Sequence, residues 1–222
     1  MLVTAQGIAV GTVGGGKIEA RALTEAALML QNGAASQFAS WNLQTDLGMT
    51  CGGMARLFFE TFNLSRWNIA IFGAGHVAQA LVRVLLPLPC AITCFDSRGE
   101  WLERLPQAPN LRRVLTPDLP AEVEKLPPST FVVLMTMGHA TDLPILRELL
   151  PRDFPYLGVI GSKTKGAALR RTLSQEGFSP EACARFFCPI GLPLGDNHPH
   201  EIAISIAAQL LQKRGEVGFA PV

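Results

Sequence analysis

The chain has 222 residues, of which 48% are hydrophobic, and its formal net charge at pH 7 is +1. This length is enough for one large domain or two small ones. The near-neutral charge argues against nucleic acid or an anionic membrane as the main partner, because both need a basic surface. No apolar run reaches the ~18 residues of a membrane span, and the first residues do not resemble a signal peptide.

The cysteines are Cys51, Cys90, Cys94, Cys183 and Cys188. Their odd number and the lack of a Cys-x-x-Cys pair argue against a disulfide framework and a structural zinc site. Cys90 and Cys94 share a strand face with Ile92, which predicts that both are buried in the core. Because no disulfide pattern is present, the cytoplasm is the expected compartment.

The first part of the chain, residues 1–63, predicts a small α+β domain. We expect a hairpin over 1–13, a helix over 17–31 that ends at Asn32-Gly33, and strands over 38–43 and 56–62. Residues 63–66 are the expected domain boundary. These elements give a thin core, and the sequence opens directly on a strand pattern. We therefore expect either a start inside a longer reading frame or a partner chain that covers the exposed strand edge.

From residue 67 onward, predicted strands and helices alternate. The strands are expected over 68–72, 91–95, 112–115, 130–135 and 156–160. The helices are expected over 76–86, 98–104, 119–126, 141–150, 164–176 and 198–213. This alternation predicts an α/β domain over 67–222, with a Rossmann-like, mostly parallel sheet that is covered on both faces.

The turn Gly73-Ala74-Gly75-His76 follows the first of these strands and opens a helix, and Asp96 ends the next strand. A dinucleotide fold places its parts in this order. The glycines let backbone N–H groups approach a pyrophosphate at the positive helix N-terminus, and Asp96 can bond a ribose hydroxyl. This fingerprint alone shows neither nucleotide binding nor a redox step.

A second candidate loop, residues 135–142, follows an apolar strand. If this strand neighbours the one before Gly73, His139 lies near the glycine turn, because ligands bind beyond the carboxyl ends of such strands. His139 can bind an anion, relay a proton or contact a metal-bound group, and its position and residue type favour such a role over that of a solvated loop residue. For Asp142, a helix cap is the favoured interpretation.

A third candidate is the turn at Ser162 and Lys163, which opens the helix expected over 164–176. A Ser or Thr cap, free N–H groups and two lysines suit a phosphate site, but they also suit an ordinary capped helix, and the sequence does not decide between these. The P-loop spacing is absent, so nucleotide hydrolysis is not expected.

Cys51 precedes Gly52 and Gly53, and two glycines let the backbone approach whatever the sulfur touches. Taken alone, however, a single cysteine is more often inert. The proline-punctuated loop over 188–195 predicts a structural element, and the broadly apolar last helix predicts either deep burial or a subunit interface. No catalytic triad or zinc-hydrolase motif is present in the sequence.

Seven motifs occur in a fixed order and cover nearly the whole chain. They span residues 11–19, 48–53, 73–78, 96–98, 158–163, 189–193 and 201–207. Together they resemble the XdhC/CoxI family, the xanthine dehydrogenase accessory proteins. The sequence departs from the family in two ways: it lacks the Gly-Ser-x-Pro-Arg segment that usually precedes the first hairpin, and it has one histidine in 136–142 where many relatives have two.

The resemblance implies a molybdenum cofactor chaperone. Such a protein binds the cofactor, as molybdopterin or its cytosine dinucleotide form, and protects it while a terminal sulfido ligand is installed. It then assists insertion into xanthine dehydrogenase or a related molybdenum hydroxylase. The implied partners are this apo-enzyme and a cysteine desulfurase, and the implied assembly is a homodimer.

The resemblance also implies roles for single residues. Cys51, with Gly52 and Gly53, becomes the favoured contact for molybdenum or its sulfur, and Glu19 lines the same cleft. Gly73 and Gly75 would receive the phosphate of the pterin cofactor, or of its nucleotide extension, rather than NAD. The other expected cofactor-binding residues are His76, Asp96, His139, Ser162 and Lys163.

Two other classes of function stay open. The first is an NAD(P)-dependent oxidoreductase, in which Asp96 would disfavour the 2′-phosphate of NADP while Arg98 tolerates it. Against it, the sequence offers no general acid/base pair for hydride transfer. The second is a scaffold without a ligand, in which the last helix docks a partner.

Overall fold

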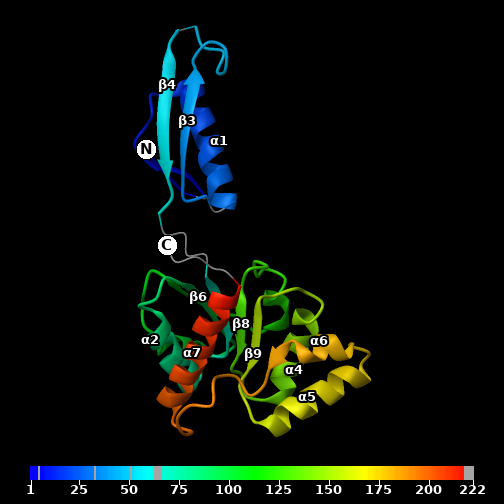
Figure 1. Ribbon diagram of the computed structural model, residues 1–222. Helices are drawn as coiled ribbons and strands as arrows, with labels where there is room; N and C mark the ends of the chain where they lie inside the picture. Colours follow the sequence, from blue (N-terminus) through cyan, green and yellow to red (C-terminus); the bar gives the residue numbers. More distant parts are fainter. Residues whose placement is uncertain (5, 33, 51, 63–66, 218–222) are drawn as a thin grey trace. The chain divides into compact units, whose positions relative to one another are not determined.

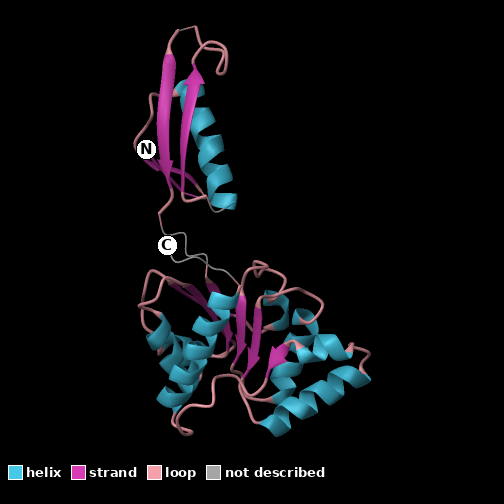
Figure 2. Ribbon diagram, viewed as in Figure 1, coloured by secondary structure: helices cyan, strands magenta, loops and turns pink. Residues whose placement is uncertain are grey.

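The computed structural model describes residues 1–4, 6–32, 34–50, 52–62 and 67–217. The chain forms two compact units, Met1–Leu64 and Ser65–Val222 (Figures 1 and 2). The predicted boundary at 63–66 lies outside the described residues. Each unit combines helices with strands, and the predicted α/β class is confirmed.

The second unit is built on a six-stranded sheet in which every pairing is parallel. Its strands are β5 (Asn68–Phe72), β6 (Ala91–Asp96), β7 (Leu111–Leu115), β8 (Phe131–Leu134), β9 (Tyr156–Val159) and β10 (Phe186–Phe187). The order β10-β9-β8-β5-β6-β7 is that of a dinucleotide-binding Rossmann fold. The strand order therefore reverses between β5 and β8, where such folds bind their ligands.

Helices cover both faces of this sheet (Figure 2). They are α2 (His76–Leu85), α3 (Gly99–Glu103), α4 (His139–Leu149), α5 (Lys163–Gln175), α6 (Pro180–Ala184) and α7 (Pro199–Glu216). The helices α2 and α7 pack together over one core cluster, whereas α4 and α5 pack over the other. Among the described residues, no helix is both long enough and apolar enough to cross a membrane.

The crossover between β7 and β8 differs from the prediction. Instead of an α-helix over 119–126, the structure has a single 3-10 turn, η1 (Pro120–Glu122), followed by further i to i+3 hydrogen bonds. Leu119, Val123 and Leu126 are all buried, so the helical spacing of apolar residues is met by successive tight turns. Pro127 and Pro128 limit the length of this segment, because proline lacks the N–H group that a longer α-helix needs. The short elements α6 and β10 were not predicted.

Two cysteines of the second unit lie in the core, as predicted. Cys90 and Cys94 are 1% and 0% exposed and belong to the cluster under α2 and α7. Burial raises the pKa of Cys90 to about 11 and that of Cys94 to about 12. Both thiols therefore stay protonated at neutral pH, and neither is a reactive nucleophile.

Two polar side chains within α7 hold the loop that follows β10. Gln209 accepts hydrogen bonds from the Tyr156 hydroxyl, at 2.5 Å, and from the Gly191 N–H, at 2.8 Å. Ser205 donates to the carbonyl of Leu192 at 2.5 Å. Both side chains are buried, so this side of α7 packs inside the unit, whereas Ile204 and Leu211 of the same helix are 55% and 37% exposed. Its polar positions fix the loop over 188–195 in place.

In its described residues, the first unit has two separate two-stranded antiparallel sheets and one helix. Its elements are β1 (Leu2–Thr4), β2 (Gly7–Val10), α1 (Gly16–Asn32), β3 (Ser36–Asn42) and β4 (Met54–Glu60). The strands β3 and β4 begin two residues earlier than predicted. The buried cluster contains Ala22, Ala39 and Trp41, which matches the expectation of a thin core.

We expect the Gln209 side chain to contribute substantially to stability. Gln209→Leu leaves the Tyr156 hydroxyl and the Gly191 N–H without their acceptor, which lowers the free energy of unfolding by about 3 kcal/mol. Gln212→Leu, at an exposed position of the same helix, is the matched control and changes it by less than about 0.5 kcal/mol. Urea unfolding measures both; equal effects would contradict the assigned role.

Candidate functional site

The glycine turn after β5 brings the ends of two strands into close contact. Gly73 has a φ of +104°, and a Cβ atom at this position would lie 2.4 Å from the carbonyl oxygen of Met135. The Met135 N–H, just after β8, donates to the carbonyl of Phe72 at 2.7 Å. The predicted neighbourhood of these two strands is confirmed. Gly73 is therefore required by the backbone packing itself, independently of any ligand.

The helices α2 and α4 begin just after β5 and β8, and neither has a side-chain cap. Gly75 precedes α2 and Gly138 precedes α4, and neither N-terminus has a capping side-chain hydrogen bond. A Cβ atom added at either glycine would have open space within 4 Å. The first N–H groups of both helices are therefore left for solvent or a ligand, and both helix ends carry partial positive charge.

A histidine stands at the first position of each of these helices. His76 is exposed and its ring makes an edge contact with Trp101, with centroids 5.0 Å apart. His139 is half-buried and begins α4, two residues earlier than the predicted helix. The fold thus places both predicted histidines at the carboxyl ends of β5 and β8. Either ring can donate a hydrogen bond to an anion at this edge of the sheet.

Asp96, the expected ribose ligand, is already fully engaged. One carboxylate oxygen accepts from the Ala74 N–H at 2.7 Å and from Arg98 Nη2 at 2.8 Å. The other accepts from Arg98 Nε at 2.9 Å and from the Arg98 N–H at 3.0 Å. Burial acts to raise the pKa of Asp96, but the hydrogen bonds from Arg98 and Ala74 outweigh it and hold this pKa below its usual range.

Asp142 is not the cap that the sequence favours. Because the helix begins at His139 after Gly138, Asp142 lies one turn inside α4 and is 0% exposed. Its carboxylate accepts from the Thr136 hydroxyl at 2.5 Å and forms an ion pair with Lys165 at 2.5 Å. These contacts among Thr136, Asp142 and Lys165 fix the loop that carries His139. None of these roles was predicted from the sequence.

The third candidate turn, at Ser162 and Lys163, is the capped start of α5. Ser162 is the N-cap of α5 and its hydroxyl accepts from the Lys165 N–H at 3.2 Å. Lys163 is exposed, whereas Lys165 folds back and donates to the carbonyl of Ile160 at 2.8 Å. The glycine at 161 makes this possible, since a Cβ atom there would lie 2.4 Å from Lys165 Cδ. That glycine was the sequence signal for the folded-back position of Lys165.

An open groove lies beside this turn. It has a volume of about 640 Å³ and runs between residues 160–162 and the loop over 189–197. The sequence predicts only a structural role for this loop. In the sequence, the glycine and prolines of Pro189-Ile190-Gly191-Leu192-Pro193 are the feature that indicates a loop of fixed shape beside this groove.

Side-chain hydrogen bonds join neighbouring segments of the first unit to the first turn of α1. The Lys17 ammonium donates to the carbonyl of Gly48, which brings the loop over 43–53 to the first turn of this helix. The Glu19 carboxylate accepts from the Thr12 hydroxyl and from the Val13 N–H. The Thr12 hydroxyl is the main reason that the pKa of Glu19 lies below its usual value.

The predicted thiol, Cys51, lies outside the described residues. Gly52 and Gly53 beside it are exposed, and Gly53 has a φ of +126° that favours glycine. Within the described parts of the chain, no group of three or more His, Cys, Asp or Glu side chains is arranged to hold a metal ion. A metal contact by Cys51 stays a prediction.

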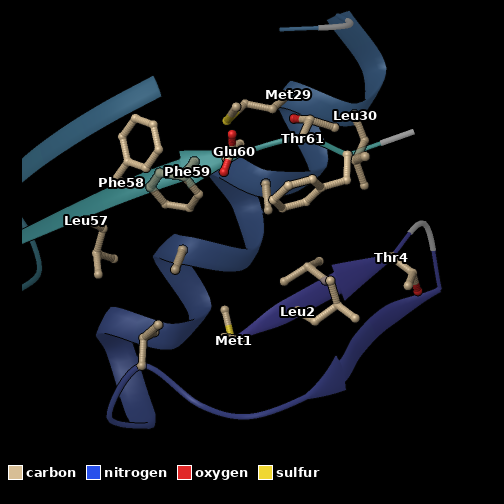
Figure 3. Close-up of a pocket in the computed structure, with 15 residues that line it drawn as sticks. Met1, Leu2, Thr4, Met29, Leu30, Leu57, Phe58, Phe59, Glu60 and Thr61 are labelled. Carbon is tan, nitrogen blue, oxygen red and sulfur yellow. The ribbon is translucent and has the colours of Figure 1, made fainter. Parts of the chain in front are cut away.

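The first unit also holds an apolar groove of about 460 Å³ (Figure 3). Met1 and Leu2 of the hairpin line one side, Met29 and Leu30 of α1 line another, and the end of β4 lines the third. Phe38 and Phe58 lie opposite each other on β3 and β4 and are each 65% exposed. Much of the apolar surface of this unit is therefore open to solvent.

Comparison with known proteins identifies the relatives of this chain. The XdhC Rossmann domain matches residues 69–210, and the XdhC and CoxI family matches residues 1–39. Uncharacterized protein YqeB from Escherichia coli (strain K12) is 31% identical over 217 residues, which cover 96% of this chain and 40% of that protein. A probable xanthine dehydrogenase subunit from Bacillus subtilis (strain 168) is 27% identical over 152 residues, covering 68% and 44%.

The chain thus spans less than half the length of these two curated relatives. Among solved structures, a xanthine dehydrogenase from Bacillus halodurans superposes on 99% of this chain and 87% of its own, with a TM-score of 0.58 and 21% identity. At that identity the likeness concerns the fold.

The two glycines of the turn after β5 should respond differently to the same substitution. Gly73→Ala forces a Cβ atom against the Met135 carbonyl and strains a positive φ, so we expect a loss of about 2–4 kcal/mol in unfolding free energy. Gly75→Ala, with extended backbone and open space, should change it by less than about 1 kcal/mol. Thermal and urea unfolding of the pair decide this; comparable losses would refute the packing role of Gly73.

Proposed function

Because the chain belongs to the XdhC and CoxI family, we propose that it binds the molybdenum cofactor and acts as its chaperone for xanthine dehydrogenase or a related molybdenum hydroxylase. One observation carries the proposal: two helices without side-chain caps, α2 and α4, begin on either side of the point where the strand order reverses. Helix ends of this kind suit a phosphate group. Molybdopterin and its cytosine dinucleotide form both carry phosphate.

Within the second unit, a phosphate group of the cofactor would be held by backbone N–H groups. The open space at Gly75 and Gly138 lets an anion approach the first N–H groups of α2 and α4. His76 and His139, at the first positions of these helices, are placed to donate further hydrogen bonds. Lys163 adds positive charge at the start of α5, while Ser162 is already occupied as its cap.

A second proposed contact concerns the first unit taken by itself. On the resemblance of its motif to the family, we assign a contact with molybdenum or its sulfur to Cys51-Gly52-Gly53, with Glu19 of α1 as a further candidate. A cysteine sulfur is a ligand that suits a soft metal or its sulfur. When bound, the cofactor supplies the molybdenum centre whose terminal sulfido ligand the target enzyme needs. The chain's own part is to bind and shield it.

The proposed partners follow from the same family. They are a cysteine desulfurase, the apo form of the target hydroxylase and a second copy of the chain, all in the cytoplasm. One relative is named as a probable xanthine dehydrogenase subunit. Since the chain spans less than half of its curated relatives, these partners are proposed for the matched region.

An NAD(P)-dependent oxidoreductase is the competing function. The Rossmann strand order and the glycine turn favour it, because both suit a dinucleotide. Against NAD itself, the carboxylate of Asp96 accepts four hydrogen bonds from the protein. The ribose of NAD is therefore left without its usual acceptor.

Equilibrium binding separates the two functions. Purified chain is titrated with molybdenum cofactor, NAD and NADP, and each mixture is followed by calorimetry and thermal shift. We expect the molybdenum cofactor to bind most tightly, and Cys51→Ala to weaken it about tenfold or more by removing the metal contact. Thr50→Ala, an exposed neighbour in the same loop, is the control and should bind like the parent chain.

Stabilisation by NAD or NADP without stabilisation by the molybdenum cofactor would reject the chaperone proposal. Unchanged cofactor binding in the Cys51 variant would reject only the proposed metal contact by Cys51.

A further inference from the structure

The side chain that meets solvent at the end of β6 is Arg98 rather than Asp96. The Asp96 side chain is 4% exposed and the Arg98 side chain is 29% exposed. Arg98 uses Nε and Nη2 to grip the carboxylate, and no described residue accepts a hydrogen bond from its Nη1 group. The aspartate therefore orients the guanidinium, and the guanidinium is what a ligand would touch.

A carboxylate has about four lone-pair sites, and those of Asp96 are taken by Ala74 and Arg98. To accept from a ribose diol, it would have to give up at least one of these bonds. The bond to the Ala74 N–H also holds the glycine turn itself. Releasing Asp96 thus disturbs the site that a pyrophosphate would occupy.

Aromatic and cationic groups surround Arg98. Its guanidinium lies over the Trp101 ring at 4.9 Å, and the guanidinium of Arg104 lies over the same ring at 4.4 Å. Arg104 is exposed. The hydrogen bonds to Asp96 are the main reason that the pKa of Arg98 lies above its usual value, and the charge of Glu100 adds to this; Arg104, over the same ring, is a second positive charge beside it. His76, at the start of α2, contacts Trp101 from the side of the glycine turn.

We propose that Arg98, fixed by Asp96 and Trp101 and supported by Arg104, is a specificity-determining residue that selects a phosphate over a ribose diol at the end of β6. In a dinucleotide fold this place lies at the ribose of the bound nucleotide, where an arginine suits a phosphate substituent. The inference rests on the proposed function in one respect, that a phosphate-containing ligand occupies this crevice.

Two small probes that differ by one phosphate test it. Adenosine 2′,5′-bisphosphate and adenosine 5′-monophosphate are each titrated into the full chain by calorimetry. We expect the bisphosphate to bind about tenfold more tightly, as a charge-assisted hydrogen bond provides. In Arg98→Lys, which keeps the charge but loses the planar fork, the ratio should fall to about threefold or less.

Two further variants keep the test independent of folding. Arg104→Ala removes an exposed charge and should lower the ratio severalfold. Arg112→Ala is the control: it is also exposed, but its register opposite Thr93 places it on the sheet face away from Leu102 and α3, so the ratio should not change. Tighter binding of the monophosphate, or no binding of either probe at millimolar concentration, would overturn the inference.

These outcomes are separate from the fate of the proposed function. A chain that binds the molybdenum cofactor without the 2′-phosphate preference retains its proposed function and loses only this role of Arg98. A chain that shows the preference but does not bind the molybdenum cofactor retains a phosphate-selective nucleotide site.

Discussion

The close approach of Gly73 to Met135 is the constraint on which the second unit depends. A Cβ atom at 73 would lie 2.4 Å from the Met135 carbonyl, so only glycine lets the ends of β5 and β8 meet. Because these strands are neighbours at the reversal of strand order, their helices α2 and α4 begin at one edge of the sheet. The packing that closes the fold therefore also brings two positive helix ends together.

Most of the architecture could be predicted from the sequence, because buried parallel strands and the helices between them have distinct apolar patterns. The crossover over 119–126 could not, since its apolar spacing is met equally by an α-helix and by successive 3-10 turns. The place of Asp142 was missed for a related reason: Gly138 lets α4 begin at His139, and this moves the carboxylate from the cap into the helix interior.

Single-residue roles were harder to predict, because a sequence does not show which polar groups are used up within the fold. Asp96 and Lys165 both have the residue type and position of ligand-binding groups. In the structure, Asp96 holds Arg98 and the glycine turn, while Lys165 holds Asp142 and the end of β9. Among the described residues, those left for a ligand at this edge of the sheet are the backbone N–H groups, His76, His139, Lys163 and the outer side of Arg98. That set favours an anion over a neutral sugar.

Amide hydrogen exchange across the glycine turn tests the central claim most directly. The first N–H groups of α2 and α4 have no acceptor within their helices, so they exchange rapidly unless a ligand accepts from them. Addition of the molybdenum cofactor should slow exchange in residues 75–78 and 139–140 together, and leave α7 unchanged. Slowed exchange confined to other regions, with both helix starts unaffected, would contradict a phosphate site at the reversal of strand order.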